Sequence, residues 1–374
     1  MTQAKAAQPT PTRSTNARPS DSLPDSTLLA WLRSMQLVRE FETRTMQAYQ
    51  QAKIGGFCHI YSGQEASAVG TIGSVEHDDP VILAYRDHGH ALVRGMTARA
   101  CMAEMFGRAP GCAKGKGGSM HMFDKPNWLF GGHGIVGAQT PLGAGLAFGS
   151  RYEWEVLETG KKKVTLCYLG DGAIDQGAFH EALNLASLFG LPVLYIIENN
   201  GYSMGTAIHR HTANHKRLVM RGESYAIKSV EIDGFDVLNV YDKFRPLVEE
   251  CRDLQRPAFV DLKTYRYMGH SMSDPQKYRT KEEVESWKER DSIAALASHL
   301  MRTAAQGGRG CLTEEAWEAM REEVASEVRD AVEFAENAAA PDVQRELYGD
   351  VYINPLPGLS PSGEYVQGEQ NPLL

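Results

Sequence analysis

Residues 164–172 read VTLCYLGDG, and residues 193–200 read VLYIIENN. Each segment is a continuous apolar run that stops at glycine, aspartate or asparagine, a pattern typical of a parallel strand buried on both faces. The residues between the two runs predict a helix over Gln176–Phe189. A strand, a helix and a second strand in this order predict an α/β fold, doubly wound, with a mainly parallel sheet flanked by helices.

The alternation of strands and helices continues on both sides of this unit. Before it, we expect a long helix from an Asp25 or Ser26 cap to Gly55-Gly56, a strand over 81–85, a helix from a Thr97 cap to Phe106, a glycine-dense loop over 107–134 and a helix over Pro141–Tyr152. After it, we expect strands over 226–232 and 258–265 with a helix near 243–252 between them, followed by two charged helices over 281–301 and 313–336.

The folded part of the chain is expected to be one domain over residues 25–352. Residues 1–24 are rich in Pro, Thr, Ser and Ala, and they nearly lack large apolar side chains. Such a segment cannot bury enough surface to order itself, so we expect a disordered N-terminal tail rather than an organelle transit peptide, for which no amphipathic face is visible. Residues 353–374 are expected to form an irregular C-terminal tail.

Composition excludes several classes of protein. The chain has 374 residues, with 39 Lys plus Arg against 47 Asp plus Glu, which gives a net charge of −8. This balance argues against nucleic acid binding, and the longest apolar run is too short to span a membrane. The six cysteines contain no C-x-x-C pair, so neither a disulfide framework nor a zinc site is expected. We expect the protein to work in a reducing compartment.

Polar residues follow both apolar runs where each predicted strand ends. Asp171 lies between two glycines, and Asn200 ends the second segment. Because parallel crossovers are right-handed and ligands bind outside the carboxyl ends of strands, we expect both residues at one edge of the sheet. A carboxylate and an amide oxygen are ligands that Mg²⁺ accepts, with phosphates and water completing its shell. The simpler interpretation, two Asx turns that close strands, stays open at this point.

Five further motifs accompany these strand ends. They read GFCHIYSGQE at 56–65, AYRDHG at 84–89, GKGGSMHM at 115–122, GIVGAQ at 134–139 and YRYMGHSMSDP at 265–275. The segment from GDG at 170–172 to NN at 199–200 resembles the thiamine diphosphate motif. All of these motifs, in this order, resemble the alpha subunit of the pyruvate dehydrogenase first component, from about Leu28 to Tyr352.

The resemblance implies a cofactor site of thiamine diphosphate and Mg²⁺. The metal ligands would be the side chains of Asp171 and Asn200 and the backbone carbonyl of Tyr202. The diphosphate would be bound by backbone N–H groups of Gly172 and Ala173 at a helix N-terminus and by Tyr85, Arg86 and Arg266. The aminopyrimidine ring would contact Gly134 and Val136, and the side chain of Met204 would force the bent shape of the cofactor.

The same resemblance implies the reaction and the partners. His59 and His270 would be the active-site histidines, with His270 also in contact with the cofactor, and they would bind the 2-oxo acid carboxylate and assist proton transfer. The implied reaction is decarboxylation of pyruvate and reductive acetylation of lipoyl groups on an acyltransferase core. A beta subunit would supply the glutamate that activates the cofactor, in a heterotetramer of two alpha and two beta chains. A bacterial cytoplasm is the expected location, ahead of a mitochondrial matrix.

The chain departs from the family pattern at a few positions. Asp175 stands where relatives usually carry Asn, so a negative charge is expected near the diphosphate unless the side chain points away or meets a partner. Met268 replaces a His of animal relatives. Ser271 occupies their phosphorylated position, whereas Lys277 occupies the second one, so we expect an unphosphorylated, bacterial-type enzyme.

Other functions remain to be distinguished. The closest are the alpha subunits of acetoin dehydrogenase and of branched-chain 2-oxo acid dehydrogenase, which share most of these motifs. Residues 132–137 also fit G-x-G-x-x-G, but a nicotinamide enzyme needs a strand just before that motif, and residues 124–128 indicate a turn. A non-catalytic scaffold is disfavoured because Asp171, Asn200, His59 and His270 are all present.

Overall fold

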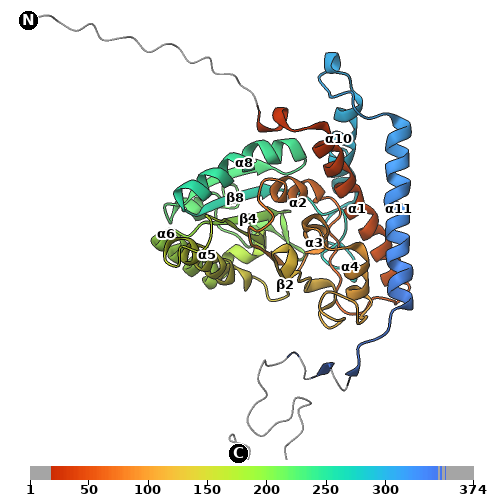
Figure 1. The fold of residues 1–374 in the computed structure, drawn as a ribbon, viewed down its shortest axis with the longest axis horizontal. Coiled ribbons are helices and arrows are strands. Elements are labelled where there is room, and N and C mark those ends of the chain that lie inside the picture. The colour runs from red at the N-terminus through yellow and green to blue at the C-terminus, as the bar shows by residue number, and fades with distance from the viewer. Residues whose placement is uncertain (1–17, 344–345, 348–349, 351–374) are drawn as a thin grey trace, which may run out of the picture.

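Six parallel strands form the central sheet of the computed structural model, which describes residues 18–343, 346–347 and 350 (Figure 1). The strands are β1 (Val81–Ala84), β2 (Leu129–His133), β3 (Thr165–Gly170), β4 (Val193–Asn199), β7 (Lys228–Asp233) and β8 (Ala258–Lys263). Their spatial order is β2-β1-β3-β4-β8-β7, and every neighbouring pair is parallel. The predicted parallel sheet is therefore confirmed.

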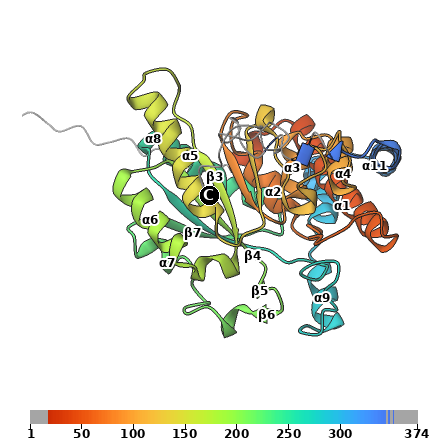
Figure 2. The same ribbon diagram turned by 90° about the horizontal axis from the view of Figure 1, so that it is seen from below.

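Helices cover both faces of this sheet, as a doubly wound fold requires (Figure 2). One face packs against α1 (Asp25–Gln50), α2 (Glu65–Ile72), α3 (His88–Arg94), α4 (Ala98–Met105) and α8 (Val237–Leu254), with α11 (Glu314–Asn337) outside α1 and α4. The other face packs against α5 (Gln139–Glu155) and α6 (Gly177–Phe189). Strand β3 shows why both layers form, because Leu166 and Tyr168 enter the first core whereas Cys167 and Leu169 enter the second.

The strand register brings the predicted functional residues to one edge. Gly170 of β3 pairs with Glu198 of β4, and Asn199 of β4 pairs with Lys263 of β8. Asp171 and Asn200 therefore leave neighbouring strands at nearly the same level. The chain also moves from β1 outward to β2 and returns to β3 on the other side of β1, so β1 and β3 enclose the point where an open α/β sheet binds its ligand.

Three elements near the site were missed by the sequence patterns. All eight residues of α2 are buried, so this helix shows no polar face and no amphipathic period. Helix α3 has the same character, with six of its seven residues buried. Strand β2 reads LFGGH, and its two glycines conceal it within the predicted loop over 107–134.

Several predicted boundaries are also corrected. Helix α1 begins at Asp25, but the cap position is Pro24 and the helix ends at Gln50, before the two glycines. The single helix predicted over 281–301 is two helices, α9 (Lys281–Lys288) and α10 (Ser292–Met301). The Asp291 side chain accepts hydrogen bonds from backbone N–H groups in the first turn of α10. Asp291 therefore caps α10 and starts it as a helix separate from α9. The expected Thr97 cap of α4 is confirmed by its hydrogen bond from Ala100 N at 3.2 Å.

The predicted tail regions fall largely outside the described residues. Where residues 18–24 are described, Pro19–Ser22 form a short 3-10 helix, and buried Ser20 donates from its hydroxyl to Asp242 at 2.9 Å. The ordered chain thus begins before residue 25. The expected C-terminal tail over 353–374 lies outside the described residues. Over residues 18–343, 346–347 and 350, no helix is both long and apolar enough to cross a membrane.

Candidate functional site

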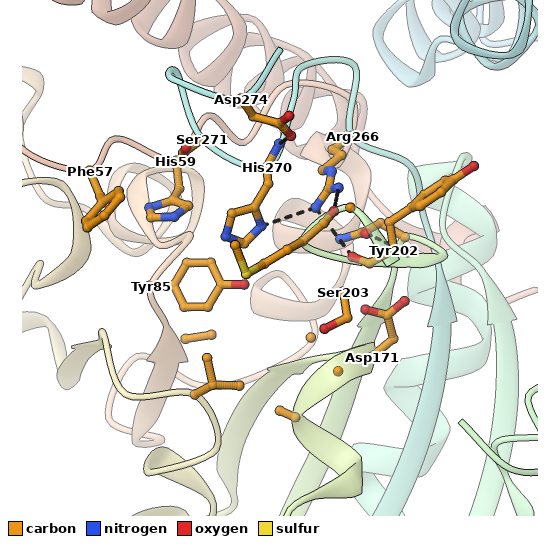
Figure 3. A pocket seen from close by; sticks show the side chains of 18 of the residues that line it. Phe57, His59, Tyr85, Asp171, Tyr202, Ser203, Arg266, His270, Ser271 and Asp274 are labelled. Atoms are coloured by element: carbon orange, nitrogen blue, oxygen red, sulfur yellow. Dashed lines mark hydrogen bonds between the residues drawn. The ribbon is translucent and has the colours of Figure 1, made fainter. Parts of the chain in front are cut away.

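A cavity of about 640 Å³ opens at the carboxyl ends of the strands (Figure 3). Segments that follow β1, β2, β3, β4 and β8 all contribute to its wall. Of the thirteen residues predicted for the site, twelve line it: His59, Tyr85, Gly134, Val136, Asp171, Gly172, Ala173, Asn200, Tyr202, Met204, Arg266 and His270. The volume lies within the range of cofactor pockets.

Asp171 is the first residue after β3 and begins a 3-10 helix over Asp171–Asp175. Its side chain is 2% exposed, and its Oδ2 atom has no hydrogen-bond partner. Burial raises the pKa of Asp171 to about 6. An unpaired buried carboxylate is costly, and a bound cation would remove that cost. Asp171 therefore fits the predicted metal ligand.

Asn200 and Tyr202 complete an oxygen-rich wall beside this carboxylate. The Oδ1 atom of Asn200 accepts a 3.3 Å hydrogen bond from Tyr202 N, and the Tyr202 carbonyl accepts one from Arg266 at 3.4 Å. Throughout the described residues, no three His, Cys, Asp or Glu side chains gather as a metal cluster. Hard oxygen ligands, few of them from side chains, suit Mg²⁺ that is bound together with a phosphate.

The part of the wall next to these oxygens suits an anion. Arg266 is 1% exposed, donates to the Met204 carbonyl and to the Tyr278 hydroxyl at 2.9 Å, and keeps a buried Nε without a partner. Met204 sits in a left-handed turn with φ of 52° and is 65% exposed at the cavity. A strained, exposed methionine in a pocket is consistent with a side chain that packs against a ligand.

Gly172 is a position on the cavity wall where any side chain would overlap Ser203. A Cβ atom there would lie 2.1 Å from Ser203 Oγ and 2.7 Å from Ser203 Cβ. We expect Gly172→Ala to weaken cofactor binding about 10- to 100-fold, since overpacking of this kind costs about 1–3 kcal/mol. Calorimetric titration of thiamine diphosphate with Mg²⁺ measures the change.

Two variants test the cause of that loss. The double substitution Gly172→Ala with Ser203→Gly removes the overlapping atoms and should restore most of the affinity. Gly177→Ala is the matched control, because an added Cβ there meets nothing within 4 Å at the start of α6. A double variant as weak as Gly172→Ala would show that the overlap with Ser203 is not the reason.

The two predicted histidines meet on the other side of the cavity, beside Tyr85 (Figure 3). The ring centroids of His59 and His270 are 5.0 Å apart, and Tyr85 lies 4.6 Å from His59 and 5.6 Å from His270. Burial and the charge of Arg86 lower the pKa of His59 to about 2 and that of His270 to about 4. Both rings are therefore neutral near pH 7, and His59 Nδ1 is buried without a partner.

Arg86 is the predicted residue that does not line the cavity. Its guanidinium is buried and donates to the carbonyl oxygens of Ile60 at 2.7 Å and His270 at 2.8 Å. The motif therefore places a cation behind the wall. There it joins the segments that carry His59 and His270 and lowers the pKa of both rings.

A buried network that supports His59 was missed from the sequence. The Glu42 carboxylate lies 3.0 Å from His88 Nδ1, and His88 Nε2 lies 2.8 Å from Ser119 Oγ. Ser119 Oγ in turn accepts a 3.2 Å hydrogen bond from His59 N. One signal was available, because Glu42 interrupts the apolar stripe of α1 directly after Phe41 and is fully buried.

The structure places two of the positions compared with the family pattern, Asp175 and Ser271. Asp175 points to Arg221 at 2.7 Å and Thr212 at 2.7 Å, and it is not part of the cavity wall. Its extra charge is thus neutralised away from the anion wall. Ser271 lines the cavity with Asp274, which accepts hydrogen bonds from His270 N at 2.6 Å and the Tyr278 hydroxyl at 2.7 Å.

The segment before the G-x-G-x-x-G motif at residues 132–137 is not only the turn expected from the sequence. Residues 125–127 do form a 3-10 turn, but β2 follows at once, so a strand does precede Gly134. Gly132 lies inside this strand, where a Cβ would stand 1.8 Å from Asp87 Oδ2. This glycine is required by packing against Asp87.

A cavity at the carboxyl ends of a parallel sheet, lined by a buried carboxylate, a buried arginine and two neutral histidines, is typical of an α/β enzyme that uses a cofactor. The chain belongs to the dehydrogenase E1 component family, whose model matches residues 33–344. This is a family of thiamine diphosphate-dependent enzymes.

Similar proteins carry the name that the motifs suggested. Pyruvate dehydrogenase E1 component subunit alpha of Rickettsia bellii is 45% identical over 323 residues, which cover 86% of this chain and 94% of that protein. The protein of the same name from Rhizobium meliloti is 46% identical over 322 residues, 86% of this chain and 88% of its own. The chloroplastic subunit alpha-3 of rice is 36% identical over 335 residues, which cover 88% of this chain and 77% of that protein. The resemblance found in the sequence is confirmed.

Proposed function

We propose that this chain is the alpha subunit of a pyruvate-decarboxylating E1 component that acetylates the lipoyl groups of an acyltransferase. The observation that carries the proposal is the buried, unpartnered Asp171 carboxylate, which lies in the same cavity as the neutral pair His59 and His270. The substrate is taken from the relatives, whose printed names specify pyruvate.

The residues that line the cavity supply the kinds of group that thiamine diphosphate and Mg²⁺ require. Asp171, Asn200 and the Tyr202 carbonyl would hold the metal, and Arg266 with the N–H groups of Gly172 and Ala173 would hold the diphosphate. When bound, thiamine diphosphate supplies an electron sink for decarboxylation of a 2-oxo acid. His59 and His270 would then bind the substrate carboxylate and hold or release a proton at their ring nitrogens.

A second chain is proposed to complete the site. Within the described part of the chain, the carboxylates on the cavity wall are Asp171, assigned to the metal, and Asp274, engaged by His270 N and Tyr278. Near the aminopyrimidine position, Ile135 is 77% exposed and Val136 is 42% exposed. An exposed apolar pair beside an incomplete site is consistent with cover from a beta subunit that brings the activating glutamate. Two alpha and two beta chains on a lipoyl acyltransferase core, in a bacterial cytoplasm, are the proposed assembly and location.

The decisive experiment uses this chain co-expressed with an E1 beta subunit from the same organism. Reduction of an artificial electron acceptor is measured with pyruvate, acetoin and branched-chain 2-oxo acids, in the presence of thiamine diphosphate and Mg²⁺. We expect pyruvate to give the highest kcat/KM. A preference for acetoin or a branched acid would replace the proposed substrate, and binding without turnover of any of them would indicate a scaffold.

Metal binding should depend on pH through Asp171. Because burial raises the pKa of this carboxyl to about 6 when no cation is bound, protons compete with Mg²⁺ below that pH. We expect the apparent Mg²⁺ affinity to be nearly constant from pH 7 to 8 and to fall, by up to about tenfold per pH unit, below pH 6. Titration of Mg²⁺ at fixed thiamine diphosphate, followed by protein fluorescence, measures this. Equal affinities at pH 5.5 and 7.5 would contradict it.

A further inference from the structure

Four sulfur atoms gather under the glycine-rich loop, away from the cofactor cavity. Cys101 Sγ, on α4, lies 3.4 Å from Met96 Sδ and 3.9 Å from Met122 Sδ. Cys112 Sγ lies 3.7 Å from the same Met122 sulfur. Cys101 and Met122 are fully buried, whereas Cys112 is partly exposed in the loop between them.

Sulfur is the ligand type that these contacts bring together. One carboxylate also lies beside the cluster, because Asp87 Oδ2 accepts a 2.9 Å hydrogen bond from Met122 N and its buried Oδ1 has no partner. A second acidic side chain, Glu104 on α4, accepts four backbone hydrogen bonds, from Ala113, Gly115, Gly117 and Gly118, at 2.7–3.0 Å. These bonds engage both of its oxygens. Thiols and thioethers are soft ligands that select Cu⁺ over the hard cations Mg²⁺ and Ca²⁺.

The distances from Met122 sulfur to the two cysteine sulfurs suit a single ion. Three sulfurs placed about 2.3 Å from a metal, the usual metal–thiolate distance, stand about 4.0 Å apart when the arrangement is trigonal. The contacts from Met122 to the two cysteines are close to this spacing. We propose that Cys101, Cys112 and Met122 bind one soft monovalent cation of the Cu⁺ type, with Met96 as a fourth neighbour.

Binding would require the thiols to lose their protons. Burial raises the pKa of Cys112 to about 12 and also raises the pKa of Cys101 well above its usual range, so both are thiols at neutral pH. The cation therefore displaces protons, and its affinity rises with pH. Once bound, it ties α4 to both ends of the segment between Cys112 and Met122. This segment includes Met120, which lines the cofactor cavity.

The test measures metal binding by the alpha–beta complex under anaerobic conditions, without substrate or cofactor. Cu⁺ is titrated against a chromophoric chelator, and X-ray absorption identifies the ligands. We expect one Cu⁺ per alpha chain with sulfur neighbours at about 2.3 Å. We expect affinity to drop more than about 100-fold in Cys101→Ala, since loss of a ligand costs at least as much as loss of a supporting contact.

Two further variants keep the proposal falsifiable. Met122→Leu conserves volume and should keep the fold while weakening Cu⁺ binding. Cys167→Ala is the matched control, because this buried cysteine packs in the core on the other face of the sheet, and its affinity should equal that of the unaltered chain. Equal binding in folded Cys101→Ala and Met122→Leu, or nitrogen or oxygen ligands in the spectrum, would overturn the site. The result does not depend on which 2-oxo acid the complex uses.

Discussion

Asp171→Ala is expected to remove cofactor binding and activity while leaving the cofactor-free protein folded. In the free chain, Asp171 Oδ2 is buried without a partner, so its loss relieves a desolvation cost. In the loaded site that we propose, the same loss would remove the anionic ligand of a buried cation. Breaking a buried ion pair costs about 3–5 kcal/mol. This corresponds to an affinity lower by a factor of about 10²–10⁴.

Thermal unfolding separates the two effects. Thiamine diphosphate with Mg²⁺ should raise the Tm of the unaltered complex, since a ligand at 100 times its Kd stabilises by about 2.7 kcal/mol, and should leave the Tm of Asp171→Ala unchanged. Asp175→Asn is the control. It lies on the same short helix but pairs with Arg221, outside the cavity, so its affinity should stay within about threefold, as expected for a surface ion pair. A full Tm increase in Asp171→Ala would exclude this residue as a metal ligand.

His270→Ala is expected to have the second large effect, which lies on turnover rather than on cofactor binding. The ring of His270 faces His59 and Tyr85 in the cavity. Its pKa of about 4 keeps it neutral, and it can both accept and donate a proton at pH 7. Loss of a positioned acid–base group lowers kcat by about 10²–10⁴. We expect the same range for His59→Ala.

Parallel measurements of binding and turnover test this assignment. Thiamine diphosphate affinity should change less than kcat in both variants, because the metal and diphosphate contacts are made by other residues. His77→Ala is the control, since His77 is exposed and contacts Asn127 at 3.0 Å, outside the cavity wall. If kcat were unchanged in His270→Ala, the ring would have no catalytic role. If kcat and affinity fell together, its role would be structural.

The sequence by itself determined the parallel sheet and most of the site. The two apolar runs that stop at Asp171 and Asn200 predict where the buried strands end. Parallel crossovers then bring successive strand ends to one edge of the sheet. Twelve of the thirteen predicted residues line one cavity for this reason, since each follows a strand or lies in a motif of the family. These residues come together because strand ends and turns are encoded locally, and the roles that the family resemblance implies for them stay predictions.

Only the tertiary structure decided features that depend on what surrounds a residue. Helix α2 carries no polar stripe because other elements cover all of its sides, so no periodicity could reveal it. Arg86 binds the carbonyls of Ile60 and His270 instead of facing the cavity, and Glu42 supports His59 through His88 and Ser119. Cys101 meets the sulfur of Met122 from 21 positions away. Burial and hydrogen bonds depend on residues that are distant in the chain, whereas sequence patterns depend on residues that are close in it. For this reason the sequence predicts strand ends and turns, and only the tertiary structure shows these contacts.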